Sequence, residues 1–132
     1  MKKEMLEKLG SLEREVSSRK REFSLFGVFL REDAEDKNKW DLLAAAPWLE
    51  ADKGKGLAYL AKEIGKLLDP DELLSISRIV ILEKGNQILE SIHKVVNVKH
   101  GNVELKNSNF FGVEITHAYI ITSSAVHPTV RV

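Results

Sequence analysis

The segment Phe23-Ser-Leu-Phe-Gly-Val-Phe-Leu30 decides the fold, because apolar side chains occupy both of its alternating sets of positions. Successive side chains of a strand point to opposite faces of a sheet, so this pattern predicts a central strand that is covered on both faces. A second strand, Trp40–Ala46, follows the polar segment Arg31–Lys39 and is closed by Pro47. The connection is too short for a parallel crossover, which predicts a sheet that is not purely parallel.

Apolar residues at spacings of three and four predict the helices. Such stripes occur in the first twenty residues, between Leu57 and Leu68, and between Ile88 and Val96. Asp52 is the predicted N-cap of the second of these helices. Asp69-Pro70-Asp71-Glu72 combines an N-cap, a proline at the first helical position and acids in the first turn. It therefore predicts a short helix that ends near Leu74.

The remaining segments predict strands. Ser75–Leu82 is rich in β-branched residues. Val103–Leu105 and Phe110–Ile115 flank Asn107-Ser108-Asn109, whose composition is typical of a turn, so we expect a hairpin there. A last strand, a candidate bulge and a candidate bend are predicted at Ala118–Thr122, Gly112 and Thr116-His117.

These elements predict an α+β fold, in which three main helices and one short helix pack on a mixed β-sheet of about five to six strands. A chain of 132 residues is of ordinary size for one core, and we expect a single domain at residues 1–123. Few apolar residues follow, so residues 124–132 are expected to form a flexible C-terminal tail.

Composition excludes several classes of function. The 20 basic and 20 acidic side chains cancel, whereas nucleic-acid binders usually carry a basic surplus, so we expect no nucleic-acid partner. The absence of cysteine excludes disulfides, thiolate nucleophiles and sulfur-ligated zinc. No stretch approaches the roughly 20 apolar residues of a membrane span, and the charged N-terminus has no signal-like apolar run. We expect a soluble, cytoplasmic protein without cofactors.

The strand pair carries the most specific pattern of residues: Phe26-Gly27, Arg31, Asp33-Ala34 and Asp41-Leu42-Leu43. Over about twenty residues it resembles the minimal nucleotidyltransferase-like superfamily. There a strand ends in Phe-Gly-Ser, Arg and Asp-Ala follow, and a second strand carries Asp-x-Asp. The resemblance implies that the aspartates hold a divalent metal against nucleotide phosphates. In this chain, however, Val28 replaces the serine and Lys39 replaces the first metal aspartate, and a lysine opposes a bound cation. The motif is degenerate, and we expect no catalysis of that kind.

Asp41 is a candidate site residue in its own right, because a carboxylate on a core strand must be paired, hydrogen-bonded or part of a site. Arg31 and Arg78 are its candidate partners. A structural ion pair is one interpretation. If Arg31, Asp41 and Arg78 converge, the alternative is a pocket for an anion or phosphate, since guanidinium groups bind such oxygens bidentately.

Two further candidate sites have simpler alternatives. His100, His117, Glu104 and Glu114 lie in the β-rich third and are of types that bind transition metals, but they lack a recognised metal-binding spacing. Three aromatic residues form either a partner-binding patch or part of the core: Trp48 after Pro47, and Phe110 and Phe111 near the hairpin.

From the sequence we therefore expect a non-catalytic module that binds another protein or forms a homo-oligomer. One alternative is a degenerate nucleotidyltransferase-like domain that binds a nucleotide or phosphate. A third interpretation is a small enzyme that uses Asp41 or His100, because active sites are assembled in space. The residues expected to hold such a ligand are Arg31, Asp33, Asp41 and Arg78.

Overall fold

The computed structural model describes residues 1–125. Within this range the helices are α1 (Lys3–Arg19), α2 (Pro47–Ala51), α3 (Lys53–Leu67), α4 (Pro70–Leu74) and α5 (Gln87–Val95). The strands are β1 (Leu25–Arg31), β2 (Trp40–Ala45), β3 (Ile76–Ile81), β4 (Val103–Phe110) and β5 (Val113–Ser123). The predicted α+β fold with a mixed sheet is confirmed. No helix in the described part of the chain is long and apolar enough to cross a membrane.

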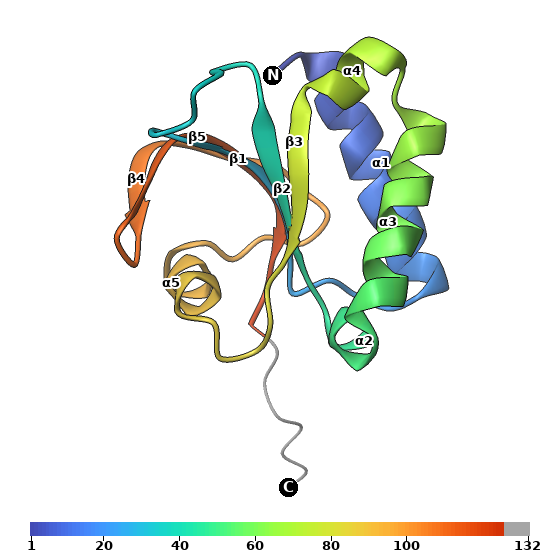
Figure 1. Cartoon of the computed structure of the whole chain (residues 1–132). Helices are drawn as coiled ribbons and strands as arrows, with labels where there is room; N and C mark the ends of the chain where they lie inside the picture. The colour runs from blue at the N-terminus through green and yellow to red at the C-terminus, as the bar shows by residue number, and fades with distance from the viewer. Residues whose placement is uncertain (126–132) are drawn as a thin grey trace, which may run out of the picture.

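The five strands form one sheet in the order β3-β2-β1-β5-β4. β1 is antiparallel to both β2 and β5, whereas β2 and β3 are parallel (Figure 1). Six consecutive residues of β1, from Leu25 to Leu30, are buried. The predicted central strand, covered on both faces, is therefore confirmed.

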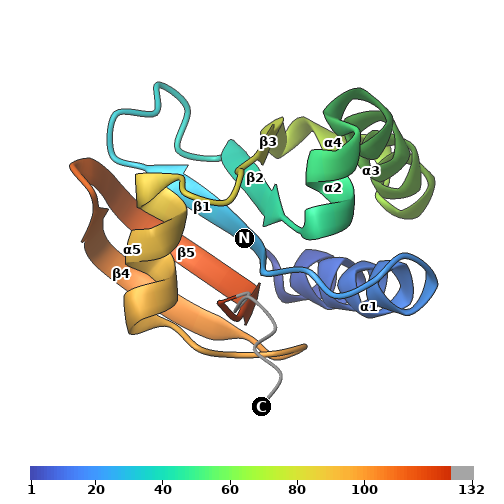
Figure 2. The same ribbon diagram turned by 90° about the horizontal axis from the view of Figure 1, so that it is seen from below.

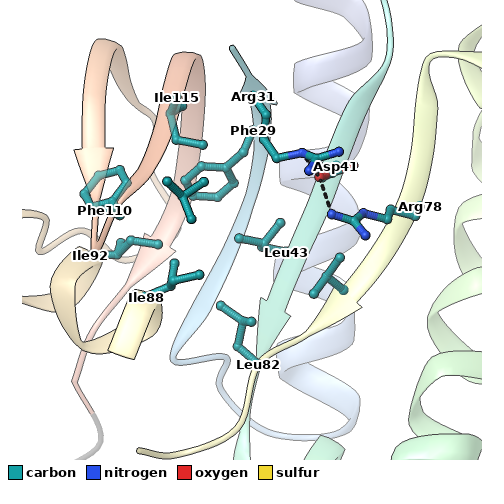
Figure 3. Close-up of a pocket in the computed structure, with 12 residues that line it drawn as sticks. Phe29, Arg31, Asp41, Leu43, Arg78, Leu82, Ile88, Ile92, Phe110 and Ile115 are labelled. Carbon is teal, nitrogen blue, oxygen red and sulfur yellow. Dashed lines mark hydrogen bonds and ion pairs between the residues drawn. The ribbon is translucent and has the colours of Figure 1, made fainter. Parts of the chain in front are cut away.

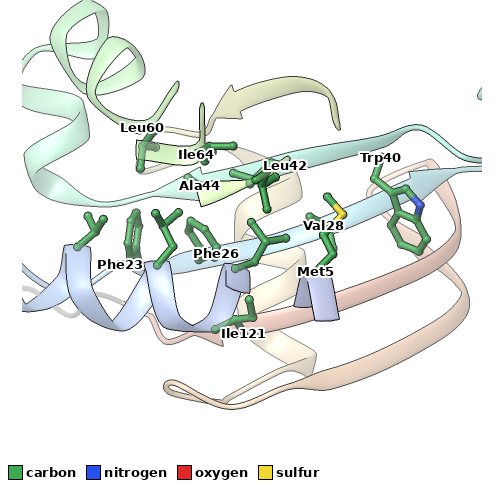
Figure 4. Packing of buried hydrophobic residues seen from close by; sticks show 14 of the residues in the cluster. Met5, Phe23, Phe26, Val28, Trp40, Leu42, Ala44, Leu60, Ile64 and Ile121 are labelled. Carbon is green, nitrogen blue, oxygen red and sulfur yellow. The ribbon is translucent and has the colours of Figure 1, made fainter. Parts of the chain in front are cut away.

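Helices α1 and α3 cover one face of the sheet, and α5 lies on the other (Figures 1 and 2). On the first face, Phe26, Val28 and Leu42 from the sheet pack against Met5 of α1 and Leu60 of α3 (Figure 4). Each fully buried side chain of this size contributes roughly 1.5–3 kcal/mol. A second cluster on the α5 face contains Phe29, Ile92, Phe110 and Ile120.

The predicted helix caps are present. The Asp52 carboxylate accepts a hydrogen bond from the Lys55 N–H at 3.1 Å. Asp69 and Glu72 form a reciprocal capping box at the start of α4. The Glu72 carboxylate also accepts from Lys8 Nζ at 2.7 Å, which ties α4 to α1. This hydrogen bond lowers the pKa of Glu72, with a further contribution from the Asp69 backbone N–H.

The prediction of only one short helix is wrong, because α2 is a second. Pro47 ends the strand as expected but also occupies the first turn of α2, where its missing N–H would have no helical partner. Trp48 of α2 packs edge-on against Phe23, with 5.5 Å between ring centroids. The Trp48 side chain is partly buried and packs against the first cluster.

The predicted hairpin turn at Asn107–Asn109 is also wrong. The turn is Phe111-Gly112, whose φ angles of 49° and 84° are both positive, as a two-residue hairpin of matching twist requires. The Asn109 side chain accepts a hydrogen bond from the Gly112 N–H at 2.9 Å. Asn107 has a φ of 50° but lies within β4, so its tolerance of left-handed geometry serves a local irregularity of the strand.

The last two predicted strands form one continuous strand, β5. Leu30 pairs with His117 and Arg31 with Ile115, so Thr116 is an extra residue at the position of the predicted bend. Gly112, the predicted bulge, lies in the turn instead. Of the predicted C-terminal tail, Ser124 donates its N–H to the Ser24 carbonyl at 2.9 Å, and residues 126–132 lie outside the described range.

A polar cluster beneath α1 joins this helix to β5. The fully buried Glu13 carboxylate accepts from Thr122 Oγ1 at 2.9 Å and Ser17 Oγ at 3.2 Å. It also lies 2.7 Å from His100 Nδ1. His100 Nε2 lies 3.2 Å from the Glu22 carboxylate. The hydrogen bond to Glu13 raises the pKa of His100.

Gly27 is required where β1 meets β5. A Cβ atom at this position would lie 2.8 Å from the Tyr119 carbonyl oxygen and 3.3 Å from the Phe29 ring. Because the closest atom belongs to the backbone of a paired strand, it cannot move without disturbing the ladder. The glycine therefore serves close packing within the sheet.

We expect Gly27→Ala to lower the free energy of unfolding by about 1–3 kcal/mol, as overpacking of a core does. Urea denaturation measures the change. Gly65→Ala is the matched control, because nothing lies within 4 Å of the added Cβ in α3. It should raise the free energy of unfolding by about 0.5–1 kcal/mol. A Gly27→Ala variant as stable as wild type would contradict the close-packing argument.

The raised pKa of His100 makes stability depend on pH. The folded state holds the proton more tightly than the unfolded state, so this contribution is complete below about pH 6.5 and is lost as pH rises through the raised pKa. His100 has a φ of 50°, and His100→Asn keeps a residue that tolerates a positive φ. It should cost about 1–3 kcal/mol at pH 6 and flatten the fall in stability between pH 6 and 8. Denaturation at several pH values tests this, and an unchanged slope would refute it.

Candidate functional site

Asp41 is the centre of a charged group at one end of the sheet. Its side chain is only 7% exposed. Arg31 Nε lies 3.1 Å and Arg78 Nη2 lies 3.2 Å from the same oxygen, Asp41 Oδ2. Arg31 Nη1 is also 3.7 Å from Asp33 Oδ1. The structure thus brings together all four residues that were predicted from the sequence, although Asp33 is 78% exposed and lies at the edge of the group.

The register of three strands places the charged residues on one face. Phe29, Asp41 and Arg78 are paired across β1, β2 and β3. Trp40 pairs with Ile76 and Asp41 with Arg78, so Ser77 is an extra residue in β3. Without this bulge Arg78 would point to the opposite face, because side-chain direction alternates along a strand. The irregularity therefore brings Arg78 to Asp41.

Both guanidinium groups keep unused hydrogen-bond donors. Each contacts Asp41 through a single nitrogen, so neither forms the two-pronged pair that arginine and carboxylate can make. Arg78 donates one side-chain hydrogen bond within the described residues, from Nη2 to Asp41 Oδ2 at 3.2 Å, so its Nε–H and Nη1–H groups are not used there. The Arg78 side chain is 54% exposed and the Arg31 side chain 37%. The arrangement can accept a further anionic group.

An apolar pocket adjoins this charged group (Figure 3). Its volume is about 160 Å³. The charged residues lie at one end, and aliphatic and aromatic side chains from the sheet and α5 form the rest. The apolar lining consists of Phe29, Leu43, Val80, Leu82, Ile88, Ile92, Phe110, Val113 and Ile115.

The pocket exists because α5 covers only part of its face. This helix has nine residues and contacts β4 and β5 most extensively. Leu43 of β2 and Val80 of β3 are paired neighbours on the same face, yet both remain half-buried. Leu43 is the one residue of β2 that is not fully buried. Figure 3 shows Leu43 between Asp41 and Leu82, facing the space beside Ile88.

Sequence reasoning missed the apolar part of the site. The sequence predicts that Leu43 and Val80 lie in strands, but it does not predict what covers them. One signal for an uncovered apolar surface is present in the sequence. Two strands carry apolar residues on both faces, but the helix available to cover the second face, α5, has only nine residues. The pairing of a nine-residue helix with β4 and β5 could not be read from the sequence.

A second, more polar hollow adjoins the charged group and shares Phe29, Arg31 and Asp41 with the apolar pocket. Its ionisable lining contains four acids and two bases: Arg31, Asp33, Glu35, Asp36, Lys39 and Asp41. Carboxylates therefore outnumber cations in this hollow. The hollow also includes Asp33 and Ala34 of the sequence motif, which lie in the loop between β1 and β2.

The histidines and carboxylates of the β-rich third form separate pairs. His117 Nε2 lies 2.6 Å from Glu104 Oε2, and this hydrogen bond lowers the pKa of Glu104. His100 contacts Glu13 instead, and Glu114 contacts Asn109. Within residues 1–125, no group of three or more such side chains is placed to hold a metal ion.

The aromatic residues that were candidates for an exposed patch are separated. Phe110 is buried in the second cluster, and Trp48 packs between Phe23 and Tyr59. Phe111 alone of the three is exposed, at 60%, on the tip of the β4–β5 hairpin. The three side chains do not form one patch.

Comparison with known proteins identifies no relative. No protein-family model, no curated protein and no solved structure matches the chain. The resemblance to the nucleotidyltransferase-like superfamily and the expected protein partner therefore stay predictions. Function must be argued from the geometry of the site.

We expect Asp41→Asn to cost more stability than Arg78→Gln. The first substitution leaves two neighbouring guanidinium groups without their carboxylate, at a cost of about 1–3 kcal/mol. The second leaves Asp41 paired with Arg31 and removes a half-exposed contact, which costs at most about 1 kcal/mol. Asp33→Asn, an exposed control of the same chemistry, should stay within about 0.5 kcal/mol of wild type. Chemical denaturation measures the free energy of unfolding of the three variants. Equal losses for Asp41→Asn and Arg78→Gln would contradict the prediction and show that Arg78 stabilises the fold as much as Asp41 does.

Proposed function

We propose that this chain is a non-catalytic binding module that takes a small, largely apolar molecule into the pocket beside α5. The observation that carries the proposal is an apolar lining that ends at two partly exposed arginines. Small-molecule sites generally combine an apolar lining with a few polar groups that fix the orientation of the ligand. Arg31, Asp41 and Arg78 give this pocket a defined polar end.

The volume of the pocket limits the size of the apolar part. An apolar cavity of about 150 Å³ can stay dry and hold a benzene molecule. The pocket volume of about 160 Å³ therefore suits a ring or chain of about six carbons. A long acyl chain or a large ring system would need side chains to move.

The chemistry of the lining supports binding rather than catalysis. General acid–base and nucleophilic catalysis need a group that exchanges a proton or attacks the substrate near neutral pH. The ionisable groups of the described lining are two arginines, which stay charged, and Asp41, which both arginines engage. No histidine, lysine or hydroxyl side chain contributes to it.

The nucleotide or phosphate alternative has weaker electrostatic support. A nucleotide near Arg31, Asp33 and Asp41 would occupy the polar hollow, where carboxylates outnumber cations. Its phosphates would be repelled unless divalent ions bridged them to the protein. The apolar pocket is the better candidate because its charged groups carry a net positive charge.

Nuclear magnetic resonance titration tests the proposal. Benzyl alcohol, hexanol, benzoate and hexanoate are added to the ¹⁵N-labelled protein. We expect saturable shifts of the amide signals of Leu43, Val80 and Ile88 with at least one probe. ATP with magnesium should leave these signals unchanged.

A pair of matched substitutions locates the binding. Val80→Trp fills the pocket and should abolish the shifts, whereas Val95→Trp, at an exposed position of α5, should preserve them. Circular dichroism and thermal unfolding establish that both variants fold. The proposal fails if no probe binds saturably up to its solubility limit, or if Val80→Trp binds as wild type does. Saturable binding of ATP around Asp33 would favour the nucleotide alternative.

A further inference from the structure

We infer that the ligand of this pocket is a small apolar carboxylate, and that Arg78 holds the carboxylate while Arg31 stays on Asp41. The inference rests on the proposed function, since it specifies the chemistry of the molecule in the same pocket. It is carried by the charge of the pocket, by the unused donors of Arg78 and by the distance from Arg78 to the apolar lining.

The charge of the pocket favours one additional negative charge. Two guanidinium groups and one carboxylate give the polar end a formal charge of plus one. A monocarboxylate neutralises it. An amine would meet two arginines at the mouth, and a dianionic phosphate would add excess negative charge beside Asp41. The acids of the neighbouring hollow, among them Glu35 and Asp36, further oppose a dianion.

Hydrogen-bonding capacity assigns the carboxylate to Arg78. Arg31 faces two acids, with Nε on Asp41 and Nη1 near Asp33. Arg78 contacts Asp41 through Nη2 only, and its Nε–H and Nη1–H groups are not used within residues 1–125. The second hydrogen of Nη2, together with that of Nε or Nη1, can offer two parallel N–H donors to a carboxylate. The larger exposure of Arg78 lets it turn toward a ligand without uncovering Asp41, because Arg31 remains in place.

The strand geometry places the apolar body of such a ligand. Val80 follows Arg78 by two residues in β3, so both side chains lie on the same face, about 6.6 Å apart along the strand. Leu43 pairs with Val80 on the neighbouring strand. A carboxylate on Arg78 therefore directs a chain or ring of about six carbons over Val80 and Leu43, toward Ile88 of α5. Figure 3 shows Leu43 and Ile88 on the same side of the sheet as the guanidinium groups.

The test compares isosteric probes that differ in their head group. Affinities of hexanoate, hexanol and hexylamine are measured by the same amide shifts, in wild type and in Arg78→Gln, Arg78→Lys and Arg31→Gln. In wild type we expect hexanoate to bind about tenfold more tightly than hexanol, as one charge-assisted hydrogen-bonded pair at a partly exposed site allows. Hexylamine should bind more weakly than hexanol.

Substitution of Arg78 should remove the preference without removing the pocket. In Arg78→Gln, hexanoate should bind no better than hexanol, while the affinity for hexanol stays within about twofold of wild type. Arg78→Lys should recover part of the preference, because lysine keeps the charge but loses the two-pronged geometry. Arg14→Gln, on the outside of α1, is the control for a lost arginine and should bind as wild type does.

The outcomes separate this inference from the proposed function. Equal affinity for hexanoate and hexanol in wild type overturns the inference and leaves the pocket as a site for neutral molecules. A preference for hexanoate that survives in Arg78→Gln but disappears in Arg31→Gln overturns the assignment to Arg78. Loss of hexanol binding in Arg78→Gln would show that Arg78 shapes the pocket, which also overturns it. Failure of every probe to bind wild type overturns the proposed function itself.

Discussion

Burial of β1 on both faces is the constraint on which the rest of the structure depends. A strand with Leu25 through Leu30 buried needs a neighbour on each edge and a cover on each face. The two edges are paired with β2 and β5. One face is covered by α1 and α3, which contact each other (Figure 2). Within residues 1–125, the other face is covered by α5 and by the curved β4–β5 hairpin (Figure 1). The pocket is the part of this second face that remains uncovered.

Irregular strand pairing places the polar residues of the site. A bulge at Ser77 brings Arg78 to the face of Asp41, and a second at Thr116 brings Ile115 to the face of Arg31. Both lie at the same end of the sheet, beside the mouth of the pocket. Bulges change the direction of side chains without changing the elements themselves, which is why they occur often at functional sites. Here they give an otherwise apolar face a charged end.

Much of the fold could be predicted from local pattern. Three features depend on residues that lie near each other in the chain: the burial of β1 on both faces, the amphipathic pattern of α1, and the helix caps at Asp52 and Asp69. The convergence of Arg31, Asp41 and Arg78 was also predictable in outline, because a carboxylate on a core strand must have partners. The α2 helix could not be predicted in this way, because a proline after a strand is explained by the end of the strand alone, whereas Pro47 also begins a helix.

The hairpin and the pocket depend on geometry that local sequence does not specify. Asn107-Ser108-Asn109 has a stronger turn composition than Phe111-Gly112. Phe110 pairs with Val113, however, so the turn must be formed by the two residues between them, Phe111 and Gly112. Tertiary pairing overrode local preference. The pocket depends on where α5 lies across the sheet, and the bulge at Ser77 depends on the register between β2 and β3. Both result from long-range contacts.

The pairing of β1 with β5 also affects how the chain folds. Leu25 pairs with Ser123 and Arg31 with Ile115, so the central strand receives one of its two neighbours from residues 84 to 98 positions later in the chain. Contacts of such long range slow folding, because a large loop must close before the pairing stabilises it. During synthesis β1 and β2 emerge early and can form their antiparallel pair, but the β5 edge of the most apolar strand stays open until nearly all of the described chain has been made. Until β5 pairs with it, this open apolar edge is a place at which incomplete chains can associate.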